Sequence, residues 1–179
     1  ILFAFGWVPY FLAGIATTRR FQFPDKENTG LTPATFQLAF EDVALATADG
    51  VRLHGWYLPH AQATNTLLFL HGNAGNLQSW FTDAEFYRRA NLDLFMIDYR
   101  GYGKSSGRIR SQAELEADVR LAWASVATQY RGQRRVFFGQ SLGTALAASI
   151  AAEVQPELTV LVSPYESMIR YDDRPVVEA

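Results

Sequence analysis

The sequence contains no cysteine and only three histidines among its 179 residues. Without cysteine there can be no disulfide bond, no thiolate nucleophile and no cysteine-ligated metal. The histidines also lack the spacing that is typical of zinc ligands. The sequence therefore predicts no metal site. The three histidines are His54, His60 and His71.

Neither sign of charge dominates the sequence. The 16 basic and 18 acidic residues give a formal net charge of −2, and neither kind forms a cluster. Proteins that bind nucleic acid usually carry a basic patch or stripe, so we expect no nucleic-acid partner. There is no internal repeat or low-complexity segment, and a hydrophobic content of 49% indicates one globular domain.

One long apolar stretch opens the sequence, ILFAFGWVPYFLAGIATTRR. Its roughly 16 apolar residues would form a helix of about 24 Å, a little short of a full membrane span. Three interpretations stay open: a membrane anchor over residues 1–18, a secretory signal cleaved after Gly14-Ile15-Ala16, and a buried amphipathic segment. An anchor followed by Arg19 and Arg20 predicts a membrane protein with a cytoplasmic body, whereas a signal predicts a secreted or periplasmic protein.

The remainder of the sequence divides into three parts. Residues 19–34, which are polar with two prolines and a glycine, predict a linker, followed by a core over residues 35–170 and a tail over residues 171–179. In the core, alternating apolar residues on either side of Ala48-Asp49-Gly50 predict two extended segments joined by a turn. Continuous apolar runs predict strands that are covered on both faces. These runs are residues 66–72, 92–100, 134–140 and 158–164.

Helices are predicted between these strands. A capping box of Ser111 and Glu114 opens the clearest one, residues 111–130. An alanine-rich run predicts another helix over residues 141–154. Strands that alternate with helices build a mostly parallel sheet with helices on both faces, so we expect an α/β fold. The apolar face of the helix at 111–130 is Leu115, Val119, Ala122, Val126 and Tyr130; a further helix after residue 72 would carry Leu77, Trp80, Phe81 and Phe86.

A Gly-x-Ser-x-Gly motif, GQSLG, joins the strand at 134–140 to the alanine-rich helix. A serine hydroxyl is a poor nucleophile at neutral pH, so it must be lifted toward a base and a substrate. A sharp turn from strand to helix does this, and glycines at its two ends leave room for the neighbouring backbone. We therefore predict that Ser141 is a nucleophile in an elbow formed by Gly139, Gln140 and Gly143.

A second loop, FLHGNAGNLQSW, offers donors for a developing oxyanion. A strand ends at His71 and Gly72, and the turn that follows leads into a helix, so backbone N–H groups can converge beside the elbow. We predict that the backbone N–H groups of Asn73 and Leu142 form the oxyanion hole. His71 lies at the strand end before the loop, and we expect it to have a structural hydrogen-bonding role rather than that of a base.

The segment DYRGYGKSSG contains Gly103-Lys104-Ser105 after a strand, which is similar to a phosphate-binding loop. Such a loop requires another glycine at position 98, but the sequence has Asp98 there, and its carboxylate would repel phosphates. We interpret the segment as a tight glycine-rich loop beside the pocket, with Lys104 and Arg108 in solvent.

The segments FLHGNAGN, DYRGYGKSSG, GQSLGT and SPYESM, in this order and spacing, resemble the α/β-hydrolase fold. The resemblance extends from about Phe21 to Met168, and it is closest to membrane-anchored serine hydrolases with a serine aminopeptidase-like domain. It implies the nucleophile and the oxyanion hole named above and an N-terminal anchor at residues 1–18. It also implies hydrolysis of esters, thioesters or amides through an acyl-enzyme, with a small acyl substrate and no metal or organic cofactor.

The sequence departs from this pattern after Ser141. In this fold the acid and the histidine of the triad follow the serine on later loops, but no histidine follows Ser141 here. Asp172 and Asp173 come too early for the acid, and we interpret them as solvated charges. We therefore expect a chain that lacks about two strand–helix units at its C-terminal end, roughly 60 residues, and whose activity is doubtful. The alternative is an inactive hydrolase-like module that binds a hydrophobic ligand or a partner.

Overall fold

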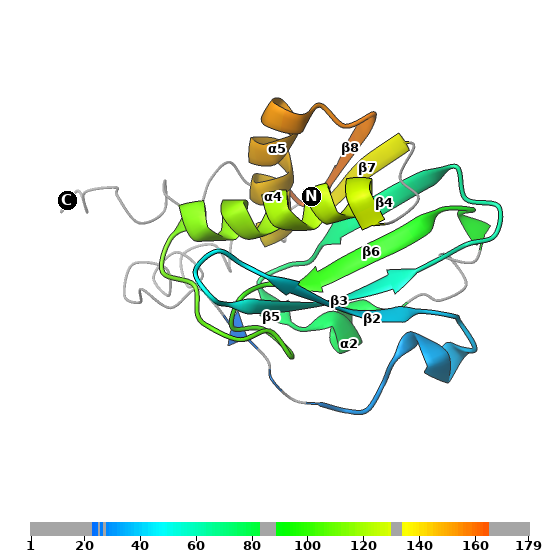
Figure 1. Ribbon diagram of the computed structural model, residues 1–179, viewed down its shortest axis with the longest axis horizontal. Helices are drawn as coiled ribbons and strands as arrows, with labels where there is room; N and C mark the ends of the chain where they lie inside the picture. The colour runs from blue at the N-terminus through cyan, green and yellow to red at the C-terminus, as the bar shows by residue number, and fades with distance from the viewer. Residues whose placement is uncertain (1–22, 25, 27, 83–88, 130–133, 165–179) are drawn as a thin grey trace, which may run out of the picture.

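A six-stranded, mostly parallel sheet forms the centre of the protein (Figure 1). The structure is a computed structural model that describes residues 23–24, 26, 28–82, 89–129 and 134–164. The strand order is β2-β3-β6-β4-β7-β8, and only β3 runs against its neighbours. The predicted α/β class with a mostly parallel sheet is confirmed. The strands are β2 (Glu41–Ala46), β3 (Arg52–Leu58), β4 (Asn65–Leu70), β6 (Asp93–Asp98), β7 (Arg134–Gln140) and β8 (Leu158–Val162).

The apolar character of each strand matches its place in the sheet. Every residue of β6 is buried, and so is every residue of β4 after Asn65, because other elements cover both faces of these central strands. At the edge, β2 alternates, with Val43 and Leu45 buried and their neighbours exposed. The predicted turn between β2 and β3 is present, and Gly50 adopts a φ of +82° in it.

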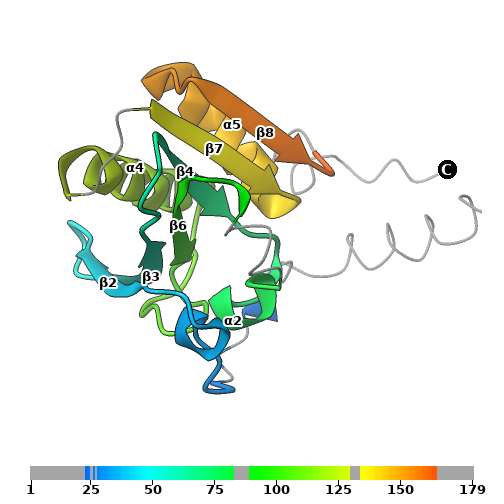
Figure 2. The same ribbon diagram turned by 90° about the vertical axis from the view of Figure 1, so that its right-hand side faces the viewer.

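Two long helices cover one face of the sheet. Figure 1 shows α4 (Gln112–Gln129) and α5 (Leu142–Val154) over this face. Their buried residues join those of the strands in the larger of two apolar clusters. Figure 2 shows β7 and β8 side by side with α5 next to them. The face predicted for α4 is confirmed for the described residues, because Leu115, Val119, Ala122 and Val126 are all fully buried; Tyr130 lies outside those residues.

Short elements cover the opposite face. The 3-10 helix η1 (Pro33–Phe36) and the single turn of helix α2 (Leu77–Trp80) pack there around the fully buried Trp56. A longer helix was predicted after residue 72. Leu77 and Trp80 lie in α2, and Phe81 is its C-cap; Phe86 lies outside the described residues.

The start of α4 differs in one detail from the predicted capping box. Ser111 Oγ accepts a hydrogen bond from the Glu114 N–H at 3.2 Å, as expected. The Glu114 carboxylate accepts instead from the N–H of Arg110, one residue earlier than the box requires, at 2.9 Å. The cap therefore still provides acceptors for two backbone N–H groups, that of Arg110 before the helix and that of Glu114 in its first turn.

The segment predicted as a linker makes specific contacts with the core. β1 (Phe23–Pro24) pairs in parallel with β5 (Ala74–Gly75), and Thr29 N–H donates to Gln78 Oε1 at 2.7 Å. The predicted anchor at residues 1–18 and the tail at residues 171–179 lie outside the described residues. Within the described part of the chain, no helix is long and apolar enough to cross a bilayer.

Candidate active site

Ser141 occupies a sharp turn between β7 and α5. Its φ of 51° and ψ of −112° lie in a region that residues other than glycine rarely adopt. Three hydrogen bonds hold this turn. The Ser141 N–H donates to Val162 O at 3.0 Å. The Ser141 carbonyl accepts from Thr144 N at 2.9 Å and from Thr144 Oγ1 at 2.6 Å. The side chain of Ser141 is half-buried rather than fully enclosed. The strained turn thus presents one serine at the C-terminal end of a parallel strand.

The glycines on either side of Ser141 allow close approach of backbone segments. A Cβ at Gly139 would lie 2.5 Å from the Gly143 carbonyl oxygen. A Cβ at Gly143 would overlap the Leu70 carbonyl group at the end of β4. Side chains at these positions would push α5 away from β4 and β7, so the turn requires glycine at both.

The loop after β4 passes directly beside Ser141. β4 and β7 pair in parallel, with Leu70 opposite Gly139, so both strands deliver their next residues to the same sheet edge. A Cβ built at Gly72 would lie 3.5 Å from the Cβ of Ser141. We refer to residues 71–77 as the oxyanion loop, after the oxyanion hole that the sequence predicts at Asn73. Leu142, buried beside it, is the first residue of α5, and its N–H has no acceptor within its own helix.

Side chains at the end of β6 hold the oxyanion loop in place. The fully buried Tyr99 donates from its hydroxyl to His71 O at 2.9 Å, and Tyr102 donates to Asn73 O at 2.7 Å. Asp98 Oδ1 accepts from the Leu77 N–H at 2.9 Å. The segment that we interpreted as a tight glycine-rich loop beside the pocket therefore also supports the other loop. The sequence analysis did not predict that Asp98, Tyr99 and Tyr102 support the oxyanion loop. A carboxylate and two tyrosines at the end of a buried strand were a visible signal for such a role.

His71 is enclosed in the core. Its ring is fully buried against Tyr99, with ring centroids 4.2 Å apart, and its Nδ1 lies 2.7 Å from Gly72 O. Burial lowers the pKa of His71, so the ring is neutral and Nδ1 carries the proton that it donates to Gly72 O. The Gly72 carbonyl and the Asn73 N–H belong to one planar peptide group, so this hydrogen bond also orients the Asn73 N–H.

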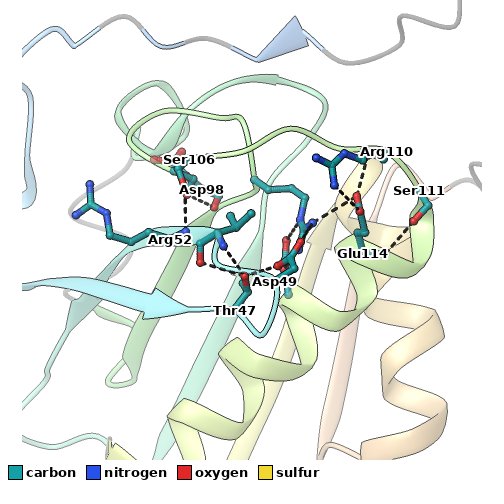
Figure 3. A network of polar contacts seen from close by, with 12 residues as sticks. Thr47, Asp49, Arg52, Asp98, Ser106, Arg110, Ser111 and Glu114 are labelled. Carbon is teal, nitrogen blue, oxygen red and sulfur yellow. Dashed lines mark hydrogen bonds and ion pairs between the residues drawn. The ribbon is translucent and has the colours of Figure 1, made fainter.

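A buried arginine joins the hairpin to α4 next to this region. The Arg100 guanidinium donates to Asp118 from both Nε and Nη2 at 2.7 Å, and Nη1 reaches Asp49 at 2.9 Å and Glu114 at 3.4 Å. The bonds to Asp118 raise the pKa of Arg100 further above its already high value. Figure 3 shows the surrounding contacts of Thr47, Asp49 and Glu114. This network fixes the turn between β2 and β3 against α4.

The described residues hold no histidine partner for Ser141. His54 lies between Asp42 and Asp98, His60 accepts from the Gln62 N–H through Nδ1, and His71 faces Gly72 O. Asp172 and Asp173 lie outside the described residues. The same part of the chain contains no group of three or more acidic or histidine side chains that could hold a metal ion.

The sheet, its order of helices and strands, and the serine turn at the end of β7 define the α/β-hydrolase fold. Residues 61–177 match the family described as serine aminopeptidase, S33, and the chain belongs to that family. An uncharacterised protein of Mycobacterium tuberculosis is 38% identical over 134 residues, which are 73% of this chain and 47% of that protein. Protein bem46 of Schizosaccharomyces pombe is 34% identical over 137 residues, 73% of this chain and 46% of that protein. The chain thus spans about half of the length of these relatives.

Solved structures support the same fold. An esterase of Pyrococcus furiosus has a TM-score of 0.66 at 23% identity, over 78% of this chain and 54% of that one. A serine hydrolase without a lid from Xanthomonas campestris has a TM-score of 0.59 at 19% identity, over 70% of this chain and 61% of that one. The chain therefore belongs to a family of hydrolases, and the similarity to these two structures concerns the fold alone.

Proposed function

We propose that this protein is a serine hydrolase that cleaves ester, thioester or amide bonds through an acyl-enzyme on Ser141. The observation that carries the proposal is the strained conformation of Ser141, with a φ of 51°, directly beside the oxyanion loop. Strain of about 1–3 kcal/mol persists only where the surrounding structure maintains it, and such strain is common at catalytic residues. The membership of the hydrolase family supports the same conclusion.

The chemistry follows from the placement of the groups. Ser141 Oγ would attack the carbonyl carbon of the substrate while a general base takes its proton. The negative charge that develops on the carbonyl oxygen would be stabilised by the N–H groups of Leu142 and Asn73. Collapse of this intermediate expels the alcohol, thiol or amine, and water then hydrolyses the acyl-enzyme. We do not assign the base to His54, because a carboxylate faces each of its ring nitrogens, or to His71, because its ring is fully buried.

The test is covalent labelling of the natural gene product with a fluorophosphonate. We expect one adduct, located on Ser141 by mass spectrometry of peptides, and none on Ser141→Ala. Ser163→Ala is the control, because Ser163 is exposed and, like Ser141, has a positive φ, of 54°. Its labelling should equal that of the wild type. A folded wild-type protein without an adduct on Ser141 would contradict the proposal and favour the alternative, a hydrolase-like module that binds a hydrophobic ligand.

We also propose that residues 1–18 anchor the protein in a membrane. The support is the apolar sequence of this segment, followed by Arg19 and Arg20. The gene product should then stay with membranes after extraction with alkaline carbonate and be released when residues 1–18 are deleted. Recovery of the undeleted protein in the supernatant would contradict an anchor.

A further inference from the structure

One buried histidine lies between two carboxylates. His54, on β3, is only 8% exposed. Its Nδ1 lies 3.1 Å from Asp98 Oδ2, and its Nε2 lies 2.5 Å from Asp42 Oδ1. Two carboxylates thus face the imidazole ring of His54, one at each ring nitrogen.

Asp98 connects this histidine to the oxyanion loop. Asp98 is 2% exposed, and its other oxygen, Oδ1, accepts from the Leu77 N–H at 2.9 Å. The Lys104 N–H approaches Oδ2 at 3.3 Å. The carboxylate also fills the space beside the Cα of Gly103, where a Cβ would overlap it. The Asp98 side chain is therefore surrounded by donors and close backbone.

The loop is held at three points along its length. Tyr99 holds His71 and Tyr102 holds Asn73, both through carbonyl groups. Asp98 alone among these side chains accepts from an N–H group of the loop, at its C-terminal end. Hydrogen bonds to an ionised acceptor are roughly twice as strong as neutral ones. The bond from Leu77 to Asp98 thus depends on Asp98 keeping its charge and its orientation.

We propose that His54 is a positioning residue for the oxyanion loop. Its Nδ1 contact with Asp98 Oδ2 directs Oδ1 at the Leu77 N–H, so the loop keeps the Asn73 N–H beside Ser141. Asp42 holds the other side of the ring, and Lys104 Nζ lies 3.7 Å from the second oxygen of Asp42. This inference rests on the proposed function, because it assigns a purpose to the loop in stabilising an oxyanion.

The experiment combines kinetics with hydrogen exchange on the natural gene product. His54→Ala should lower kcat for p-nitrophenyl butyrate about tenfold or more while KM changes less than about twofold, because a misplaced oxyanion donor affects mainly the transition state. Amide exchange in residues 71–81 should become faster, and exchange in residues 134–154 should not change.

Asp118→Asn is the matched control, because it also disturbs a buried ion pair but does not touch the oxyanion loop. It should lower stability and leave kcat and the exchange of residues 71–81 unchanged. Asp42→Asn is a second variant at a position that is largely exposed, and it removes the charge of one of the two carboxyl groups that face His54. It should change kcat and exchange in the same direction as His54→Ala, but less.

The outcomes separate the two proposals. Unchanged exchange in residues 71–81, or an unchanged kcat in both His54→Ala and Asp42→Asn, would overturn the role of His54. If the wild type neither hydrolyses the ester nor reacts with the fluorophosphonate, the proposed function is wrong. In that case the exchange of residues 71–81 alone decides whether His54 positions the loop.

Discussion

Replacement of Gly139 by alanine would add one methyl group where β7 meets the first turn of α5. A Cβ at this position lies 2.5 Å from Gly143 O, 2.7 Å from Gly143 C and 2.9 Å from Thr144 Cα. Ordinary contacts of carbon begin at about 3.5 Å, so α5 would have to move by roughly 1 Å. All three neighbours are backbone atoms, and no side-chain rotation can relieve the overlap.

The expected cost lies at the upper end of the range for overpacked cores, about 3 kcal/mol. In a protein of this size 1 kcal/mol lowers Tm by about 2–4 °C, so Tm should fall by about 6–12 °C. The assay is thermal unfolding followed by circular dichroism. Labelling of Ser141 by the fluorophosphonate should also become slower, because a shift of α5 moves the Leu142 N–H.

Gly50→Ala is the control for this prediction. Gly50 has a φ of +82° and nothing within 4 Å of an added Cβ, so its replacement introduces backbone strain without overlap. The expected cost is about 1 kcal/mol, or about 2–4 °C in Tm. A Tm for Gly139→Ala no lower than that for Gly50→Ala would refute the argument from close approach.

Two further predictions concern buried charges. Asp118→Asn removes the bidentate partner of the buried Arg100 and should lower the free energy of unfolding in urea by about 3 kcal/mol. Glu153→Gln, at an exposed ion pair, should leave the midpoint of urea denaturation unchanged. Equal effects of the two substitutions on the midpoint would contradict this reasoning. Burial lowers the pKa of His71 from 6.5, so its neutral form stabilises the fold fully above pH 6.5, and this stabilisation is lost as the pH falls through the folded-state pKa. The stability of the wild type should therefore decrease more steeply between about pH 7 and about pH 5 than that of His71→Asn, and parallel curves would show that His71 is not responsible.

The strands and the helices α4 and α5 were predictable because their signals are local. Continuous apolar runs identified β4 and β6, alternation identified β2, and an alanine-rich run after a glycine identified α5. Each of these patterns depends only on which faces of an element are covered. The position of Ser141 between β7 and α5 followed from the same local reasoning.

The partners of polar side chains were not predictable in this way. Tyr99 and His71 are 28 residues apart, and Asp98 and His54 are 44 residues apart. Their contacts arise from the order of strands in the sheet, which brings β3 and β4 to either side of β6. The contacts of Thr29 with Gln78 were missed for the same reason, because composition alone gave this segment the character of a linker.

The hydrogen bond from the Ser141 N–H to Val162 O implies an order of events during synthesis on the ribosome. The described side chains that hold the oxyanion loop all lie before residue 106, so this loop can settle while later residues are still being added. The serine turn acquires its acceptor only after β8 has been made and has paired with β7. In a nascent chain, the acceptor of the Ser141 N–H is therefore made after the described side chains that hold the oxyanion loop.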